Sequence, residues 1–233
     1  MKRLLLLFPV MLVMLMTSCL KDNFDQGTIV LMGTESDVKP IDSVIPDTLL
    51  SFITNGTAMG SVGALSLPRG NMPPDIQGEY IFCPIELCAD NGYGVPRNDT
   101  LFFRFGGGDQ DQHNMTVSCD LYGDVMEKGD IYHRKSQPKA YVMGNGNNFT
   151  AYFTLDYDCE FQGETYKIKR GYVIMGTVSS AGIDHAVMAC VNISVDEVSG
   201  QGYVNPPQKD YIYVYRVKTF DNQFGLAQRY QWY

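Results

Sequence analysis

Acidic side chains at alternate positions are the first candidates for chemistry in this sequence. Asp156, Asp158 and Glu160 are spaced two residues apart, so all three would share one face of a β-strand. Paired carboxylates can hydrolyse glycosidic bonds or coordinate Ca²⁺. Like charges in a row are, however, also typical of a strand face exposed to water. We predict such a solvated face here and keep a metal site as the alternative.

A stripe of tyrosines is the second candidate. Tyr211, Tyr213 and Tyr215 alternate along a predicted strand and would also share one face. Tyrosine rings can stack on sugars or line an apolar pocket, and they can equally pack in a core that holds no ligand. The spacing leaves both interpretations open.

The cysteines allow few covalent links. Of the six cysteines, Cys19 closes a hydrophobic N-terminal segment, and the other five form an odd set, which excludes a full disulfide framework. Cys119 and Cys159 fall on the apolar side of predicted strands, where a thiol behaves as a small hydrophobic group. Cys83 and Cys88 flank four residues, a spacing that fits no zinc site. A disulfide between them in an oxidising compartment and two free thiols both remain open.

Motifs of catalysis and of nucleic-acid binding are missing from the sequence. No two of the three histidines, His113, His133 and His185, have the spacing of a helical zinc site. There is no nucleophile elbow, phosphate-binding loop or dinucleotide fingerprint. The net charge of −8 gives no attraction to phosphate backbones. We therefore predict a protein that is not an enzyme, needs no cofactor and does not bind nucleic acid.

Short β-strands are the elements that would position these side chains. The chain is 12% aromatic and 19% charged and contains 23 glycines, a composition typical of strands and turns. From residue 72 onward, apolar and polar residues alternate in short runs, most clearly between Phe149 and Asp158. Short connections rich in Gly and Asn favour sequential antiparallel strands. We predict an all-β fold, an antiparallel up-and-down barrel of about eight strands, with a β-sandwich as the alternative.

A short helix is predicted before the barrel. Apolar residues recur between Asp47 and Gly56, with Asp47 as the N-cap and Gly56 as the stop signal. The chain then becomes rich in Gly, Ser and Pro, which indicates an irregular connection. The predicted organisation is a helix and connection over residues 46–71 and a barrel domain over residues 72–233.

The N-terminus has the layout of a secretory signal peptide. Two cations and an apolar run over residues 4–16 lead to Thr17, Ser18 and Cys19. The run has 13 residues, too few for a helix that spans a membrane. The segment resembles the signal of a bacterial lipoprotein. This resemblance implies removal of residues 1–18 and acylation of Cys19, which would attach the protein to a membrane through lipid.

The residues after Cys19 resemble the export signal that places lipoproteins of the Bacteroidetes on the outside of the outer membrane. Lys21, Asp22 and Asp25 carry this resemblance. It implies that residues 19–45 form a lipidated N-terminus and tether. It also implies that the domain is anchored to the outer membrane and faces the cell exterior.

Two stretches of the predicted barrel resemble known groups. Gly78-Glu79-Tyr80 resembles the start of a lipocalin or calycin barrel, in which a glycine and an aromatic residue two positions later close one end. More broadly, the layout from Ser43 to Val217 resembles a group of uncharacterised Bacteroidetes outer-membrane lipoproteins, on the basis of Ile45-Pro46, residues 73–80 and residues 148–153. The first resemblance implies a barrel, and the second implies no activity.

Two classes of function follow. In the first, the chain is an envelope lipoprotein that binds a small apolar molecule or a glycan inside the barrel or at its mouth, since about eight strands can enclose one small ligand. In the second, it is a structural or interaction lipoprotein that docks to another envelope protein and has a filled core. A cavity lined by the tyrosines would favour binding, and an interior plugged with Phe, Leu and Met would favour the structural role.

Overall fold

The computed structural model describes residues 39–92, 100–106, 110–122, 131–134, 139–161, 164–199, 207–217 and 225–230. All of them belong to one compact unit that spans residues 36–233. The predictions for residues 1–38, among them the signal peptide, the lipidated Cys19 and the export signal, lie outside the described residues.

Strands make up most of the described structure, and short helices precede them. The helices are α2 (Ile41–Val44), α3 (Asp47–Thr54) and the 3₁₀-helix η1 (Gly60–Val62). The strands are β1 (Asn71–Met72), β2 (Gly78–Phe82), β3 (Ile85–Asp90), β4 (Leu101–Phe105), β5 (Thr116–Tyr122), β6 (Ile131–Arg134), β7 (Lys139–Asn145), β8 (Asn148–Phe161), β9 (Glu164–Val178), β10 (Gly182–Ser199), β11 (Ile212–Val217) and β12 (Ala227–Tyr230).

Eight of the described strands close into a ring. In ring order, β2, β4, β5, β7, β8, β9, β10 and β12 each pair antiparallel with the next, and β12 pairs back with β2. The ring follows the order of the chain, which is up-and-down connectivity. The predicted all-β antiparallel up-and-down barrel is therefore confirmed, and the β-sandwich alternative is not.

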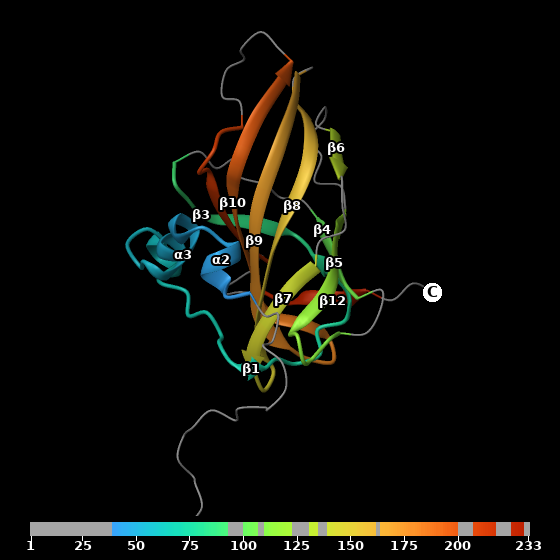
Figure 1. The fold of residues 1–233 in the computed structure, drawn as a ribbon. Helices are drawn as coiled ribbons and strands as arrows, with labels where there is room; N and C mark the ends of the chain where they lie inside the picture. The colour runs from blue at the N-terminus through green and yellow to red at the C-terminus, as the bar shows by residue number, and fades with distance from the viewer. Residues whose placement is uncertain are drawn as a thin grey trace, which may run out of the picture. The chain divides into compact units, whose positions relative to one another are not determined.

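The longest ring strands extend beyond the ring and pair there with inserted strands. β8 pairs with β7 through its first residues and with β6 through residues 157–160. β10 pairs with β12 at residues 182–183 and with β11 at residues 187–191, and β11 pairs in turn with β3. Beyond the ring, the strands therefore continue as an open sheet in the order β3, β11, β10, β9, β8 and β6 (Figure 1).

Aromatic side chains fill the interior of the ring. The alternation predicted on β8 is observed, because Phe149, Ala151, Phe153 and Leu155 all face the interior core. Five aromatic side chains of this core have an exposed fraction of 0%: Tyr80, Phe82, Phe103, Phe149 and Phe153. A cavity able to hold a water molecule would leave accessible surface on the side chains that line it. The described interior is therefore solid around these rings, as expected of a close-packed protein core.

Tyr80 and Arg229 join the first and last strands of the ring. The Tyr80 hydroxyl donates to the carbonyl oxygen of Ile76 (2.9 Å) and accepts from Arg229 Nη2 (3.1 Å). The guanidinium carbon of Arg229 lies 5.6 Å from the centroid of the Tyr80 ring, within the range of a cation–π contact. The aromatic residue of the Gly78-Glu79-Tyr80 motif thus lies where β12 closes the barrel on β2.

Helices α2 and α3 pack on the outer face of β8, β9, β10 and β11 (Figure 1). Leu49 and Ile53 lie four residues apart on α3, so both side chains face the barrel, and both are fully buried. Ile41 and Ile45 are buried in the same layer, although they fall within the segment predicted as a tether. The described chain is thus packed on the barrel from its first helix onward.

The predicted helix is confirmed over Asp47–Thr54, but both predicted caps are wrong. Asp47 is the first helical residue, and Pro46 holds the N-cap position without a side-chain hydrogen bond because proline has no acceptor to offer. At the other end, the cap is Asn55 in an extended conformation rather than a left-handed Gly56. The Oδ1 atom of Asn55 accepts from the backbone N–H of Thr57 (2.9 Å), a local bond that competes with the continuation of a helix.

Candidate functional site

A groove lies between the helices and the outer wall of the barrel and has a volume of about 460 Å³. Such a volume falls within the usual range of small-molecule sites, roughly 300–1,000 Å³. The lining residues come from α2, α3, the loop before β1, the turn before β5, and strands β7 and β8: Pro40, Ile41, Asp42, Asp47, Leu50, Arg69, Gly70, Met115, Met143 and Tyr152.

The floor of the groove is apolar and contains one tyrosine. Tyr152 stacks on Tyr141 with ring centroids 5.6 Å apart, and its hydroxyl donates to the carbonyl oxygen of Lys39 (2.6 Å). Burial raises the pKa of Tyr152 to about 12, and the neighbouring Tyr141 and Asp42 add to this increase. The phenol therefore stays protonated at physiological pH, and its polar atom is already engaged.

The barrel-side wall of the groove is a loop fixed to β7 and β8. The carbonyl oxygen of Pro68 accepts from Thr150 Oγ1 (2.8 Å), and that of Gly70 accepts from the backbone N–H of Gly144 (3.2 Å). A Cβ atom at residue 70 would lie 2.4 Å from the carbonyl oxygen of Gly144, so only glycine permits this approach. Arg69 is held between these two anchors and contributes an exposed guanidinium to the groove.

The structure places the predicted tyrosine stripe next to the interior core. Tyr211 and Tyr215 are each only 7% exposed, and Tyr213 is partly buried. Successive rings lie 6.4 and 6.3 Å apart between centroids. None of the three lines the groove. Their burial favours core packing, and a ligand-lining role for them stays a prediction.

Arg170 ties this stripe to the neighbouring strands. Its guanidinium carbon lies 5.9 Å from the centroid of the Tyr213 ring, and its Nε donates to Asn192 Oδ1 (2.8 Å). Asn192 is 0% exposed, and its Nδ2 donates to the carbonyl oxygen of Gln208 (2.9 Å). These contacts connect β9, β10 and β11. They also give the buried Asn192 side chain hydrogen-bond partners for both its oxygen and its nitrogen.

The predicted acidic strand face is matched by lysines on the next strand. Asp156 is opposite Lys169 and Asp158 is opposite Lys167 in the β8–β9 register, while Glu160 is opposite Thr165. Opposite charges in such cross-strand positions stabilise a sheet. Within the described residues, no group of three or more His, Cys, Asp and Glu side chains could hold a metal ion. Asp156 is exposed to solvent, whereas Asp158 is partly buried, so the solvated face is observed at Asp156 and stays a prediction for the other two positions.

Of the two alternatives left open for Cys83 and Cys88, the structure has the two free thiols and no disulfide between them. Cys88 lies three residues after the start of β3 at Ile85, so the extended chain carries it roughly 10 Å away from that end. A disulfide needs Cα atoms within about 7 Å of each other. Cys83 is exposed and accepts from Thr100 Oγ1 (3.0 Å).

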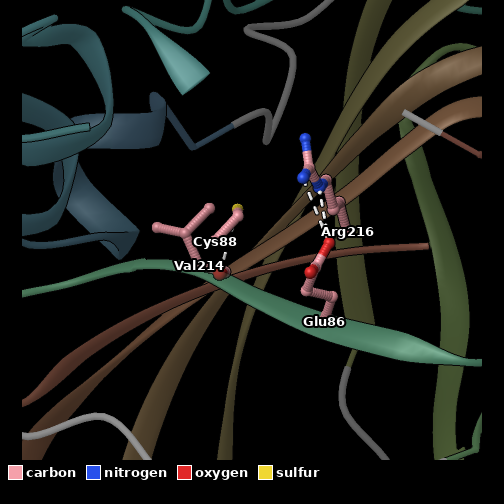
Figure 2. Close-up of polar contacts among 4 residues, drawn as sticks. All are labelled: Glu86, Cys88, Val214 and Arg216. Atoms are coloured by element: carbon pink, nitrogen blue, oxygen red, sulfur yellow. Dashed lines mark hydrogen bonds and ion pairs between the residues drawn. The ribbon is translucent and has the colours of Figure 1, made fainter. Parts of the chain in front are cut away.

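Cys88 belongs to a packed contact between β3 and β11. Its Sγ donates to the carbonyl oxygen of Val214 (3.2 Å), and Arg216 donates from Nε and Nη2 to Glu86 Oε2, both at 3.1 Å (Figure 2). Burial raises the pKa of the Cys88 thiol to about 11, although the Arg216 charge opposes the increase. These contacts attach β3 to β11. The Cys88 thiol is protonated at neutral pH, so it is not a reactive thiolate.

We expect iodoacetamide to modify Cys83 and to leave Cys88 unmodified in the folded protein at pH 8. The thiolate is the reactive form, and a pKa of about 11 leaves on the order of 0.1% of Cys88 as thiolate at that pH. Peptide mass spectrometry measures both sites, and unfolding in urea before labelling should make Cys88 react. Equal modification of the two residues in the folded protein would contradict the raised pKa and partial burial of Cys88.

No sequence pattern marks the residues of the groove. Asp42 falls within the predicted tether, Asp47 was predicted as a cap, and Arg69 falls within the predicted irregular connection. Met115 and Met143 come from separate strand regions. Only the folded chain brings them together, because the groove forms where two helices cross the outside of a barrel.

Comparisons with known proteins do not assign this chain to a family. No family model, no curated protein and no solved structure matches it. In the part of the chain that the structure describes, no helix is both long enough and apolar enough to cross a membrane.

Proposed function

We propose that this protein is a non-enzymatic binding module of the bacterial cell envelope, lipid-anchored at Cys19 to the outer membrane, and that it binds a small apolar molecule in the groove between its helices and its barrel. The groove carries this proposal, because it combines a volume of about 460 Å³ with an apolar floor. The anchor and the location rest on the resemblance of residues 1–25 to lipoprotein signals.

The barrel interior gives this proposal no support. A ligand there would have to displace rings such as Phe103 and Phe153, which have no accessible surface. Displacing packed core side chains costs several kcal/mol, as large-to-small substitutions of such residues show. We therefore propose a binding site on the outside of the barrel.

An apolar ligand suits the groove better than a glycan does. Glycan sites use exposed aromatic faces on which sugar rings stack. Tyr152, the aromatic residue of the groove, is only 2% exposed, and its hydroxyl is engaged by Lys39. Ile41, Leu50, Met115 and Met143 instead provide an aliphatic floor.

A structural or interaction role is the second candidate, and the solid interior of the barrel favours it. A filled core gives a rigid domain that can dock to another envelope protein without a ligand. Under this alternative, the groove would be an ordinary surface depression between secondary-structure elements.

Native mass spectrometry of the full-length protein purified from its own host separates the two candidates. The binding proposal expects a reproducible extra mass that is released on denaturation. A Leu50→Trp variant, which fills the groove, should lose this mass. Phe52→Trp is the matched control, since Phe52 is also partly buried on α3 but does not line the groove.

A bare mass for the wild-type protein would overturn the binding proposal in favour of the structural role. An extra mass that Leu50→Trp retains would move the ligand away from the groove and return attention to the tyrosine stripe.

A further inference from the structure

We infer that α2 is a gate on the groove, which opens about the Ile45-Pro46 junction and is held closed by the hydroxyl of Tyr152. α2 can act on the groove because Ile41 and Asp42, in its first turn, are among the lining residues. The purpose of the gate rests on the proposed function, whereas its movement can be measured without a ligand.

One hydrogen bond joins α2 and its flanking residues to the barrel. The Tyr152 hydroxyl donates to the carbonyl oxygen of Lys39 at 2.6 Å, just before the helix. We call this bond the latch. Among the described residues, it is the only hydrogen bond from residues 39–45 to the barrel, because the N–H groups of Ser43 and Ile45 donate within the segment (3.0 and 2.7 Å). Loss of the latch would therefore leave α2 attached to the barrel by apolar contacts alone.

The Ile45-Pro46 junction has the properties of a hinge. Both residues have extended backbones, with ψ angles of 128° and 143°, so the hydrogen bonding of α2 ends before that of α3 begins. Ile45 is only 1% exposed, and a Cβ atom at Gly171 of β9 would lie 3.3 Å from its Cδ1 atom. The side chain of Ile45 is thus packed closely on the barrel, which fixes the junction while α2 turns about it.

Less apolar contact holds α2 than holds α3. α2 buries Ile41 and part of Val44, whereas α3 buries Leu49 and Ile53 completely. Segments with few buried apolar contacts open locally at a lower free energy than the rest of a protein. We therefore expect α2 to open while α3 stays on the barrel (Figure 1). Its movement would widen the groove on the side that Ile41 and Asp42 line.

Native-state hydrogen exchange of the full-length protein, followed by NMR without a ligand, tests the gate. A single helical turn is not stable away from the barrel, so its amides exchange when it opens. Tyr152→Phe removes the latch and keeps the ring. We expect the amides of Ser43 and Ile45 to exchange roughly fivefold faster in this variant, the effect of one hydrogen bond of ordinary strength. The Leu65 amide, which donates to Ile53 at the end of α3, should be unchanged.

Thr150→Val is the matched control. It removes the hydroxyl that donates to Pro68 (2.8 Å) and so fixes the opposite end of the helix layer to β8. Because this bond lies beyond α3, its loss should leave the exchange of Ser43 and Ile45 unchanged.

The outcomes separate the gate from the proposed function. Unchanged exchange of Ser43 and Ile45 in Tyr152→Phe would overturn the gate, and so would an equal acceleration of Leu65, which would show a general loss of stability. In either case, an extra native mass that Leu50→Trp abolishes would still support the proposed function. The expected exchange together with a bare native mass would keep the latch, but it would overturn the proposed function and the role of α2 as a gate.

Discussion

Replacing Phe153 with alanine is expected to lower the free energy of unfolding by about 3–5 kcal/mol, the usual cost of truncating a buried phenylalanine. Phe153 has an exposed fraction of 0% and stacks on Tyr172, its direct partner across β8 and β9, at 5.1 Å between ring centroids. At this point β9 is paired on both edges, with β8 and with β10, which limits how far it can move to close the cavity. Urea denaturation followed by circular dichroism measures the change.

Met72→Ala is the control for this variant. Met72 is 66% exposed at β1, so its truncation should change the unfolding free energy by no more than about 0.5 kcal/mol. A Phe153→Ala variant as stable as Met72→Ala would mean that the barrel interior is not solid there. The interior would then again be a candidate for ligand binding, and the groove would lose its advantage over it.

The sequence predicts the fold well where one face of a strand is buried and the other face is exposed to solvent. On β8 beyond residue 153, Leu155 is buried and Asp156 is exposed, so the alternation is plain. The turn between β7 and β8 is also marked locally, because Gly146 adopts a φ of +60°, which favours glycine. Barrel closure in chain order then follows from short connections.

Strand β7 shows why other elements escaped prediction. Its inward residues Ala140 and Val142 are buried, and its outward residues Tyr141 and Met143 are also apolar because they pack against the helix layer. When both faces are covered, the period of two disappears from the sequence. The four-residue β12 is missed for a different reason, since its place in the ring depends on pairing with β10 and β2 rather than on a local pattern.

The candidate site was less predictable than the fold. A stripe such as Tyr211, Tyr213 and Tyr215 reveals a shared face but not whether that face lies in a core or a cavity. The groove depends on Asp42, Arg69 and Met143, which are far apart in sequence and meet only after α2 and α3 pack on the barrel. Nothing in the sequence around a charged residue of a predicted connection indicates that it will line a groove.

Gly182→Ala is expected to destabilise the protein by at least about 2 kcal/mol, because it strains the contact that closes the ring. A Cβ atom at residue 182 would lie 2.0 Å from the carbonyl oxygen of Ala227, and the φ of +150° is rarely adopted by other residues. Overpacking and backbone strain each cost about 1–3 kcal/mol. Among the described residues, Gly182 and Ile183 pair β10 with β12, and the N–H of Arg229 donates to the carbonyl oxygen of Ala181 beside them, so the strain falls on a short seam.

Two measurements separate this effect from a general loss of stability. Amide hydrogen exchange should accelerate more in β12 and β2 than in the β8–β9 pair, because β12 lies at that seam and carries Arg229 to Tyr80. Gly56→Ala is the matched control, since a Cβ atom there would lie 3.4 Å from its nearest neighbour, an ordinary contact. If Gly182→Ala were as stable as Gly56→Ala and showed unchanged exchange in β12, the last strand would not be needed to close the barrel. The up-and-down ring would then be held by its first seven strands and by the plug of aromatic side chains between them.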